Sequence, residues 1–411
     1  MTTTTLKSLI AVSKDGEWGK GEPSDDAVAM GVIRGTDFGS IRIGDVTELP
    51  TRYIPKRIAE RKTLQPHDIV FETAGGSKDS PTGRCVYIAP SIMQRATLPL
   101  TCASFSRFIR IDPSKADPRF VFWYLQYLYS SGYIRQYHTQ HTGVARFQFT
   151  VFSENEPLYL PPLATQRKIA SILSAYDDLI ENNTRRIAIL EEMAQALCRE
   201  WFVYFRFPGH EQVRMVESEM GAVPEGWEVK RLSSLVETQY GYTESASEAE
   251  IGPKYVRGMD INKASYIVWD TVPYCPISSS DYDKYKLAVG DVLVIRMADP
   301  GKVGMIEKDI DAVFASYLIR LKRASPLISP FYLFYFLLSE RYQSYISGAS
   351  TGTTRKSASA GVITDHYLCT FEGRTCSIAH RAVQAWCRST LATTEVRYAS
   401  TDYMYGWPAA P

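Results

Sequence analysis

The feature that most constrains the fold of this chain is a long helical pattern near its middle. Apolar and aromatic residues recur there in alternating steps of four and three, which places them on one face of a helix. A heptad stripe sustained over this length predicts a coiled-coil helix, and such a stripe needs a partner surface. The stripe consists of Ile169, Leu173, Tyr176, Ile180, Asn183, Ile187, Leu190, Ala194, Leu197 and Trp201.

The residues that flank the stripe predict where the helix begins and ends. Pro161-Pro162 cannot continue a helix backwards and Thr165 is a suitable N-cap, whereas Phe207-Pro208-Gly209 ends the pattern. Roughly 40 residues at about 1.5 Å each would make a rod of about 60 Å, which suits a spacer. The polar stripe residue, Asn183, either fixes the register of a helix pair or faces a gap or solvent, and both interpretations stay open.

The two sides of this helix carry similar sequences, which predicts a duplicated domain. Short motifs recur in the same order, and the repeating unit is far longer than that of a solenoid. Short β-type runs, Gly/Pro turns and aromatic-rich helical segments in each copy are typical of an α+β domain. The matched pairs are Leu6–Leu9 with Leu232–Leu235, the Arg-Gly-x-Asp motifs at Arg34 and Arg257, Leu64–Val70 with Leu287–Leu293, Gly83-Arg84 with Gly301-Lys302, Ala103-Ser-Phe105 with Ala315-Ser-Tyr317, Phe120–Leu128 with Phe331–Leu338, and the Thr-Gly-x-x-Arg motifs that end at Arg146 and Arg355.

The composition restricts the class of protein. The net charge is +1, which argues against a histone-like protein but leaves room for a local basic face. The 7 cysteines include no Cys-x-x-Cys pair, so neither a disulfide framework nor a zinc site is expected. The N-terminus has no apolar core of signal-peptide length, and no apolar run approaches a membrane span. We therefore expect a cytoplasmic protein without a membrane partner.

Longer motifs in and after the helical pattern resemble those of a known family. They are Leu160-Pro-Pro-Leu-Ala-Thr-Gln-Arg-Lys-Ile-Ala-Ser-Ile-Leu173, Ala175-Tyr-Asp-Asp-Leu-Ile-Glu-Asn-Asn183, Met193–Phe207 and Val223-Pro-Glu-Gly-Trp-Glu-Val-Lys-Arg-Leu232. Together with the repeated Arg-Gly-x-Asp, Gly-Asp-Val-Leu and Thr-Gly-x-x-Arg motifs, they make the chain resemble the DNA-specificity subunit of type I restriction–modification systems. The resemblance extends from Met1 to about Asp365.

This resemblance implies a fold and a function. It implies an α+β fold with two similar target-recognition domains, residues 1–160 and 208–365, each binding one half of a bipartite double-stranded DNA site. A central coiled-coil helix, residues 161–207, would join them. The chain would be a non-catalytic subunit that directs methylation and restriction by its partners. It would hold no cofactor itself, while methyltransferase (modification) subunits use S-adenosylmethionine and a restriction/translocase subunit uses ATP and magnesium.

Residues 366–411 depart from the family pattern. The family closes its second domain with another Leu-Pro-Pro-Leu-x-x-Gln helix, but no heptad and no lysine follow Asp365 here. We hypothesise an atypical tail, out of frame or disordered; the alternative is a divergent helix over Cys376–Thr390. Without a second helix, the heptad stripe would associate with another copy of the chain, stay exposed or be covered by modification subunits.

The candidate DNA contacts lie in or beside the repeated Gly- or Thr-rich motifs. Arg and Lys bond phosphates, and Arg, Gln and Thr also bond base edges. Arg34 and Arg257 have an alternative role, because each can pair with the Asp of its own motif. The candidates are Arg34, Lys78, Arg84, Arg146 and Gln148 in the first copy and Arg257, Lys302, Thr353, Thr354, Arg355 and Lys356 in the second. The stripe residues are the candidate subunit interface.

Two other functions compete with the DNA-reading subunit. Asp68 and Glu72, four residues apart, could serve a stand-alone nuclease, although the second copy has Ile295 at the position of Glu72. A coiled-coil scaffold without DNA affinity is the other alternative. His138 and His141 lack a visible third ligand, so no metal site is expected. The chain also lacks a Walker-type phosphate loop and a methyltransferase-type motif, and we expect no catalytic residues.

Overall fold

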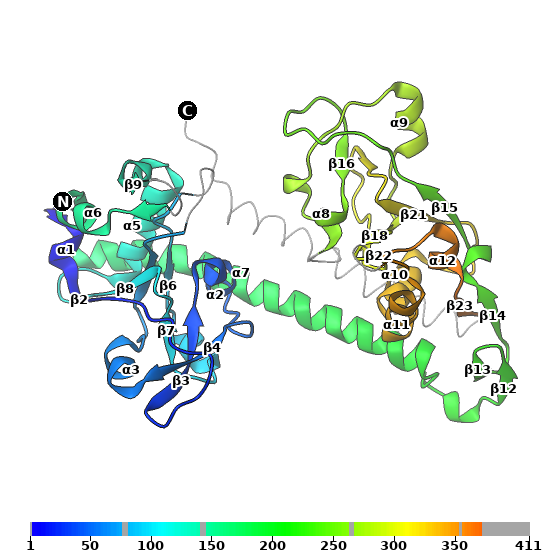
Figure 1. The fold of residues 1–411 in the computed structure, drawn as a ribbon, viewed down its shortest axis with the longest axis horizontal. Helices are drawn as coiled ribbons and strands as arrows, with labels where there is room; N and C mark the ends of the chain where they lie inside the picture. Colours follow the sequence, from blue (N-terminus) through cyan, green and yellow to red (C-terminus); the bar gives the residue numbers. More distant parts are fainter. Residues whose placement is uncertain (1, 76–80, 140–144, 263–266, 353–355, 372–411) are drawn as a thin grey trace. The chain divides into compact units, whose positions relative to one another are not determined.

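The computed structural model describes residues 2–75, 81–139, 145–262, 267–352 and 356–371 (Figure 1). Internal contacts divide the described chain into two compact units, one ending at Arg185 and the other beginning at Arg186. The division falls within one helix, α7 (Leu163–Cys198), which appears in green in Figure 1. Each unit therefore includes part of α7 and is described separately.

Unit 1 is built around two small sheets. The first has the strand order β2-β8-β5-β6, and the second has the order β4-β3-β7, in which β3 and β7 are parallel. Strand β1 pairs with β11 and β9 pairs with β10, both antiparallel. The strands are β1 (Thr2–Thr5), β2 (Ile10–Asp15), β3 (Ala27–Ile33), β4 (Thr51–Pro55), β5 (Ile69–Glu72), β6 (Cys85–Tyr87), β7 (Leu100–Cys102), β8 (Ser106–Ile111), β9 (His138–Thr139), β10 (Arg146–Phe147) and β11 (Pro157–Leu160). The helices are α1 (Leu6–Leu9), α2 (Phe38–Arg42), α3 (Lys56–Lys62), α4 (Pro90–Arg95), α5 (Pro118–Ser130) and α6 (Phe149–Asn155).

Unit 2 repeats this plan. Its largest sheet has the order β15-β21-β17-β19, and β16 and β20 form a parallel pair. Three further antiparallel pairs are β14 with β23, β12 with β13 and β18 with β22. The strands are β12 (Met215–Ser218), β13 (Gly221–Pro224), β14 (Trp227–Arg231), β15 (Val236–Tyr240), β16 (Lys254–Val256), β17 (Val292–Ile295), β18 (Met297–Ala298), β19 (Val303–Met305), β20 (Ala312–Phe314), β21 (Leu318–Arg323), β22 (Lys356–Ser357) and β23 (Tyr367–Phe371). The helices are α8 (Gly258–Asn262), α9 (Ser279–Tyr285), α10 (Pro330–Leu338), α11 (Glu340–Ala349) and α12 (Ala360–Thr364).

The predicted α+β fold, with two similar domains joined by a central helix, is confirmed. The four-stranded sheets correspond strand for strand, β2-β8-β5-β6 to β15-β21-β17-β19. Buried aspartates hold equivalent turns before β5 and β17. Asp68 Oδ2 accepts a 2.7 Å hydrogen bond from the Gln65 amide, and Asp291 Oδ2 accepts one of 2.9 Å from the Ala288 amide. The matched Leu-x-Pro-x-Asp and Leu-x-x-Gly-Asp motifs therefore form the same turn.

The aromatic-rich segments also form the predicted helices, because each has a capping side chain followed by proline. Asp117 Oδ1 accepts a 2.9 Å bond from the Phe120 amide at the start of α5. Ser329 Oγ accepts a 3.0 Å bond from the Tyr332 amide at the start of α10. Such caps satisfy amides that have no partner within the helix. Most of the rings then point into the core of their own unit.

The central helix differs from its prediction at both ends. Helix α7 begins at Leu163, so Thr165 lies in its first turn and is not the N-cap. Gln166 is buried there: its Oε1 accepts a 3.0 Å bond from the Asp117 amide, and its Nε2 donates to the Pro161 carbonyl at 2.8 Å. The Gln of the Leu-Pro-Pro-Leu-x-x-Gln motif thus joins α7 to α5. At the other end α7 stops at Cys198 and a π-helical turn, Arg199–Val203, follows.

The second unit extends beyond Asp365. Strand β23 pairs antiparallel with β14 as β11 pairs with β1 in unit 1. Tyr367–Phe371, at the start of the predicted tail, thus form a strand and are not disordered, because backbone pairing continues the repeat where the side-chain pattern changes. An out-of-frame origin of the tail stays a prediction. The rest of the predicted tail, including Cys376–Thr390, lies outside the described residues. The other predicted domain boundaries stay predictions.

In the part of the chain that the structure describes, no helix combines the length and the apolar composition needed to cross a membrane.

Candidate nucleic-acid interface

The Arg-Gly-x-Asp motif forms the same closed pair in both units. Arg34 donates from its amide and from Nε and Nη2 to the Asp37 carboxylate at 2.8, 2.9 and 2.8 Å. Arg257 makes the same three bonds to Asp260 at 2.7, 3.2 and 3.0 Å. The alternative role predicted for both arginines is therefore confirmed. A guanidinium already bonded to a carboxylate has less to offer a phosphate, so these two are weaker DNA candidates.

Arg84 and Lys302 occupy equivalent backbone positions but have different surroundings. The Arg84 carbonyl accepts from the Glu72 amide at 2.8 Å, and the Lys302 carbonyl accepts from the Ile295 amide at 2.9 Å. Arg84 also forms a two-pronged ion pair with the buried Glu72 carboxylate, at 2.9 and 2.6 Å. Because Ile295 replaces Glu72, Lys302 has no carboxylate at the equivalent position, and its side chain is exposed.

A short strand brings Arg146 to the same end of the unit 1 sheet. Ala74 is bridged to Arg146, and the Phe147 amide donates to the Thr73 carbonyl at 2.9 Å. Arg146 and Gln148 are both exposed, and no ion pair of Arg146 occurs within the described residues. Arg146 is therefore placed to meet a ligand at this end.

The equivalent strand in unit 2 corrects one sequence match. There the Ala358 amide donates to the Arg296 carbonyl at 2.9 Å, as Phe147 donates to Thr73. The backbone equivalent of Arg146 is thus Ser357, two residues after the predicted Arg355, because the loop before the strand is longer. Exposed Lys356 lies beside this position. The other predicted contacts, Lys78, Thr353, Thr354 and Arg355, lie outside the described residues.

These positions meet at one end of each four-stranded sheet, which we call the reading end. A Cβ on Gly35 would lie 2.5 Å from Glu72 Oε1 and 3.4 Å from Arg84 Nη2, so the Arg-Gly-x-Asp turn lies against the Arg84–Glu72 pair. In unit 2 a Cβ on Gly258 would lie 3.7 Å from Ile295 Cδ1. The reading end of unit 1 comprises Arg34, Arg84 and Arg146, and that of unit 2 comprises Arg257, Lys302 and Lys356.

Two arginines at these ends were missed by the sequence prediction. Arg296 lies over the Tyr240 ring at 5.0 Å and donates to the Ser316 carbonyl at 3.3 Å. Arg107 pairs with Asp15 at 2.6 Å and lies over the Phe149 ring at 5.0 Å. Neither belongs to a motif shared by the two copies, so repetition alone gave no signal for them.

The carboxylates proposed for a nuclease are held by arginines. Asp68 is fully buried and accepts from Arg110 Nε and Nη2 at 2.7 and 2.8 Å, while Glu72 is bonded to Arg84. A carboxylate saturated by a guanidinium cannot at the same time bind a metal ion. Among the described residues no group of three or more His, Cys, Asp or Glu side chains is arranged to hold a metal. His138 instead accepts from the Thr82 amide at 3.1 Å, and His141 lies outside the described residues.

The predicted heptad stripe is only partly exposed on α7. Ile187 and Ala194 are buried, whereas Ile169 and Tyr176 are 36% and 53% exposed. The remaining predicted interface residues, Leu173, Ile180, Asn183, Leu190, Leu197 and Trp201, are half-buried. The stripe therefore straddles the border between the covered face of the helix and the open face. The open face also carries the exposed apolar residues Ile172, Leu179, Ile189 and Met193, which the predicted register missed.

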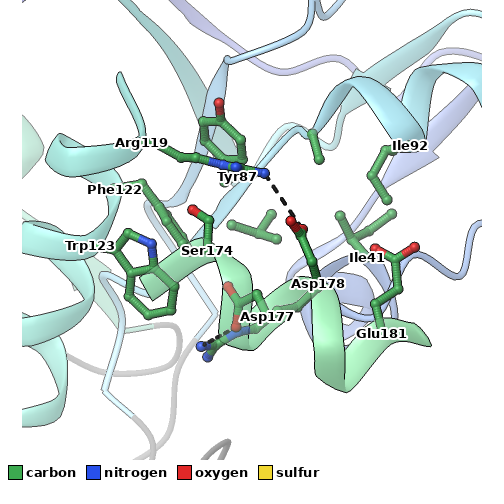
Figure 2. Close-up of a pocket in the computed structure, with 13 residues that line it drawn as sticks. Ile41, Tyr87, Ile92, Arg119, Phe122, Trp123, Ser174, Asp177, Asp178 and Glu181 are labelled. Carbon is green, nitrogen blue, oxygen red and sulfur yellow. Dashed lines mark hydrogen bonds and ion pairs between the residues drawn. The ribbon is translucent and has the colours of Figure 1, made fainter. Parts of the chain in front are cut away.

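Ion pairs hold the first half of α7 against unit 1 (Figure 2). Asp177 lies 3.3 Å from Arg42, and the next residue, Asp178, lies 3.8 Å from Arg119; Figure 2 shows the two carboxylates directed at different arginines. Glu181 pairs with Arg95 one turn later. Burial raises the pKa of the Asp177 carboxyl above its ordinary value of 3.8, and the charge of Arg42 opposes that rise.

These three pairs surround a small cavity lined by both aromatic and charged side chains. The Trp123 ring lies 5.5 Å from the Arg42 guanidinium, and Arg119 lies 5.4 Å from the Tyr87 ring. Every residue that lines the cavity belongs to unit 1. The cavity lies between α7 and the rest of unit 1, so the charged and aromatic residues that line it hold the helix against the unit.

Comparison with known proteins finds similarity over part of the chain. Residues 60–192 match the model of the type I restriction modification DNA specificity domain. The specificity subunit of the type I restriction enzyme MjaVIII from Methanocaldococcus jannaschii is 32% identical over 222 residues, which are 52% of this chain and 51% of that protein. Over this part of its length the chain is similar to the specificity subunits of type I restriction enzymes. The EcoBI specificity subunit from Escherichia coli is 24% identical over 212 residues, which are 48% of this chain and 44% of that protein.

The chain spans about half the length of these two relatives. A solved structure, the S subunit of a type I restriction–modification system from M. genitalium, is similar in fold with a TM-score of 0.52. It is 14% identical and covers 96% of this chain and 93% of its own. The segment that matches the family model includes Arg84 and Arg146 as well as most of α7. The reading end of unit 1 is thus formed partly by the segment that matches this domain model.

Proposed function

We propose that this chain is a sequence-specific DNA-binding subunit that reads a bipartite duplex site and directs methylation and restriction by partner subunits. The observation that carries the proposal is the pair of equivalent reading ends. The same turn, the same sheet end and the same kind of short strand bring cations together in each unit. Two similar surfaces of this kind suit two half-sites, each bound through phosphates and base edges.

The chemistry of the complex would reside in other subunits. We infer that the chain itself is non-catalytic and holds no cofactor. Methyltransferase (modification) subunits would use S-adenosylmethionine, and a restriction/translocase subunit would use ATP and magnesium. The open face of α7, with Ile172, Tyr176 and Leu179 each more than half exposed, is the surface we assign to subunit association, with modification subunits or with a second copy. We also infer that the complex is cytoplasmic, since these partners would act on host DNA.

The proposal is tested by selecting duplexes from a random library with the full chain assembled with modification subunits. We expect the selected sequences to contain two conserved blocks separated by a spacer of constant length. We also expect Lys302→Ala to weaken binding and to lower the dependence of log K on log salt by about 0.9, the contribution of one phosphate contact.

Lys322→Ala is the matched control, because Lys322 is also exposed but lies toward the opposite end of β21. It should leave both the affinity and the salt dependence unchanged. An assembled complex that shows no preference among duplex sequences would contradict the proposal.

A further inference from the structure

Each reading end displays an aromatic ring that the fold does not use. Phe105 is 61% exposed and Tyr317 is 53% exposed, although both belong to otherwise well-packed units. The two rings are the last residues of the repeated Ala-Ser-aromatic motif and directly precede β8 and β21. A ring that stays exposed contributes no free energy of apolar burial to the stability of the folded state. Two exposed rings at equivalent positions therefore call for an explanation outside the fold.

The turns that carry the rings are rigid and alike. The Ser106 amide bonds the Ala103 carbonyl and the Leu318 amide bonds the Ala315 carbonyl, at 2.8 and 2.9 Å. Behind each turn lies a glycine backbone with no room for a side chain. A Cβ on Gly16 would lie 2.1 Å from the Ala103 oxygen, and a Cβ on Gly241 would lie 2.2 Å from the Ala315 oxygen.

The ring-bearing residues are also bonded to the strands of the reading end. The Phe105 carbonyl accepts from the Thr73 amide at 2.9 Å, and the Tyr317 carbonyl accepts from the Arg296 amide at 3.0 Å. The backbone that carries each ring is therefore held in place, so little backbone entropy is left to lose on binding.

The charge around the rings favours a polyanion. Ala74, which also donates to the Phe105 carbonyl, is bridged to exposed Arg146. In unit 2 the Arg296 guanidinium bonds the carbonyl of Ser316, the residue before Tyr317. The unit 1 carboxylates Asp15, Asp37 and Glu72 at this end are each paired with an arginine. An apolar ring beside a cation, as in both units, matches the phosphate rim and apolar base edges of DNA, and in unit 1 the three nearby acids are already paired.

We propose that Phe105 and Tyr317 are equivalent specificity contacts, each packing against base edges of one half-site in duplex DNA. This inference rests on the proposed function and names two residues of it. The ring supplies apolar contact, for example with a thymine methyl group, while the neighbouring cations hold the backbone. Because β8 and β21 begin at the reading ends, each unit has one ring there, and each ring would contact its own half-site.

The test repeats the library selection with the assembled complex carrying Phe105→Ala or Tyr317→Ala. Each variant should bind the wild-type site about tenfold more weakly and lose base preference at one or two positions of a single half-site, a different half for each variant. The salt dependence should stay unchanged, because no phosphate contact is removed. Phe105→Tyr and Tyr317→Phe should retain both the affinity and the preference, since each keeps the ring.

Tyr159→Ala is the control, because Tyr159 is 53% exposed on β11, outside the reading end. Unchanged preference and affinity in both alanine variants would overturn the inference while the selected wild-type site still supported the proposed function. A loss of complex assembly, measured by light scattering, would instead assign the rings to a protein partner and also overturn it. If the wild-type complex selects no site, the proposed function itself fails.

Discussion

The two units share a frame but differ at their reading ends. In both, a buried aspartate closes the turn before the central strand, and the Arg-Gly-x-Asp pair closes the turn beside it. At the reading end, however, unit 1 has the ion pair Glu72–Arg84 where unit 2 has Ile295 and the exposed Lys302. The repeat therefore preserves the backbone scaffold, while the side chains that would meet DNA vary on it.

The buried aspartate of the sheet is held more tightly in unit 1 than in unit 2, so its removal should cost more free energy of unfolding there. Asp68 receives two short bonds from Arg110, whereas Asp291 lies 3.4 Å from Arg320. Asp68→Ala should lower the free energy of unfolding by about 3–5 kcal/mol, because it leaves a guanidinium without its buried partner. Asp291→Ala should cost less. Urea denaturation of the full chain measures both, and a larger loss from Asp291→Ala would contradict the comparison.

The glycines before Arg84 and Lys302 have the same backbone conformation but different neighbours in the two units. Both have positive φ, +105° at Gly83 and +94° at Gly301, where a side chain is strained. A Cβ on Gly301 would lie 2.4 Å from Ile346 Cγ2, and a Cβ on Gly83 would lie 3.0 Å from the Phe147 ring. Gly301→Ala and Gly83→Ala should each cost about 1–3 kcal/mol in thermal or urea unfolding, with Gly301→Ala the more costly. Equal stability of both variants and the wild type would show that the turns are not constrained.

The reading ends can be made more alike by one substitution. Glu72→Ile gives unit 1 the residue that unit 2 has and removes the carboxylate partner of Arg84. The released guanidinium should add one phosphate contact, so the salt dependence of duplex binding should steepen by about 0.9 in log K against log salt. Glu72→Gln, which keeps the side-chain shape, controls for packing. An unchanged salt dependence would mean that Arg84 does not face DNA.

The smallest effect concerns the attachment of α7 to unit 1. The folded-state pKa of Asp177 is raised, so its carboxyl favours folding when protonated. That contribution is fully present below the ordinary pKa of 3.8 and is lost as the pH rises through the raised value. The stability of the wild type relative to Asp177→Asn should therefore increase as the pH falls from 7 to 4. Asp178→Asn is the control on the same helix, and a relative stability that decreases on acidification would contradict the assignment.

The motifs repeated in the two copies made most turns of the backbone scaffold predictable from the sequence. The matched Arg-Gly-x-Asp, Gly-Asp and Gly-Arg/Lys motifs correspond to turns whose backbone geometry allows few residues, so they recur in both copies. The predicted internal pair of Arg34 with Asp37 followed from the same argument. The strand β23 could not be predicted this way, because backbone pairing with β14 tolerates many side chains.

The helix face and the reading ends were harder to predict. A heptad pattern gives the period of the apolar residues, but which edge of the stripe is covered depends on the Asp177, Asp178 and Glu181 pairs formed after folding. Arg296 and Arg107 were missed because only the folded sheet brings them to the reading end, and neither belongs to a repeated motif. The sequence match paired Arg146 with Arg355, whereas its backbone equivalent is Ser357, two residues later. The loop before the strand differs in length between the copies, which short motifs do not reveal.

The main proposal is that both reading ends meet DNA, one on each half-site. It is tested most directly by placing a photo-crosslinking amino acid at Arg146 or at Lys302 in the assembled complex bound to its selected duplex. We expect each position to crosslink to DNA, position 146 within one half-site and position 302 within the other, while the same amino acid at Lys322 gives no DNA crosslink. Crosslinks from both positions to protein subunits alone would contradict it.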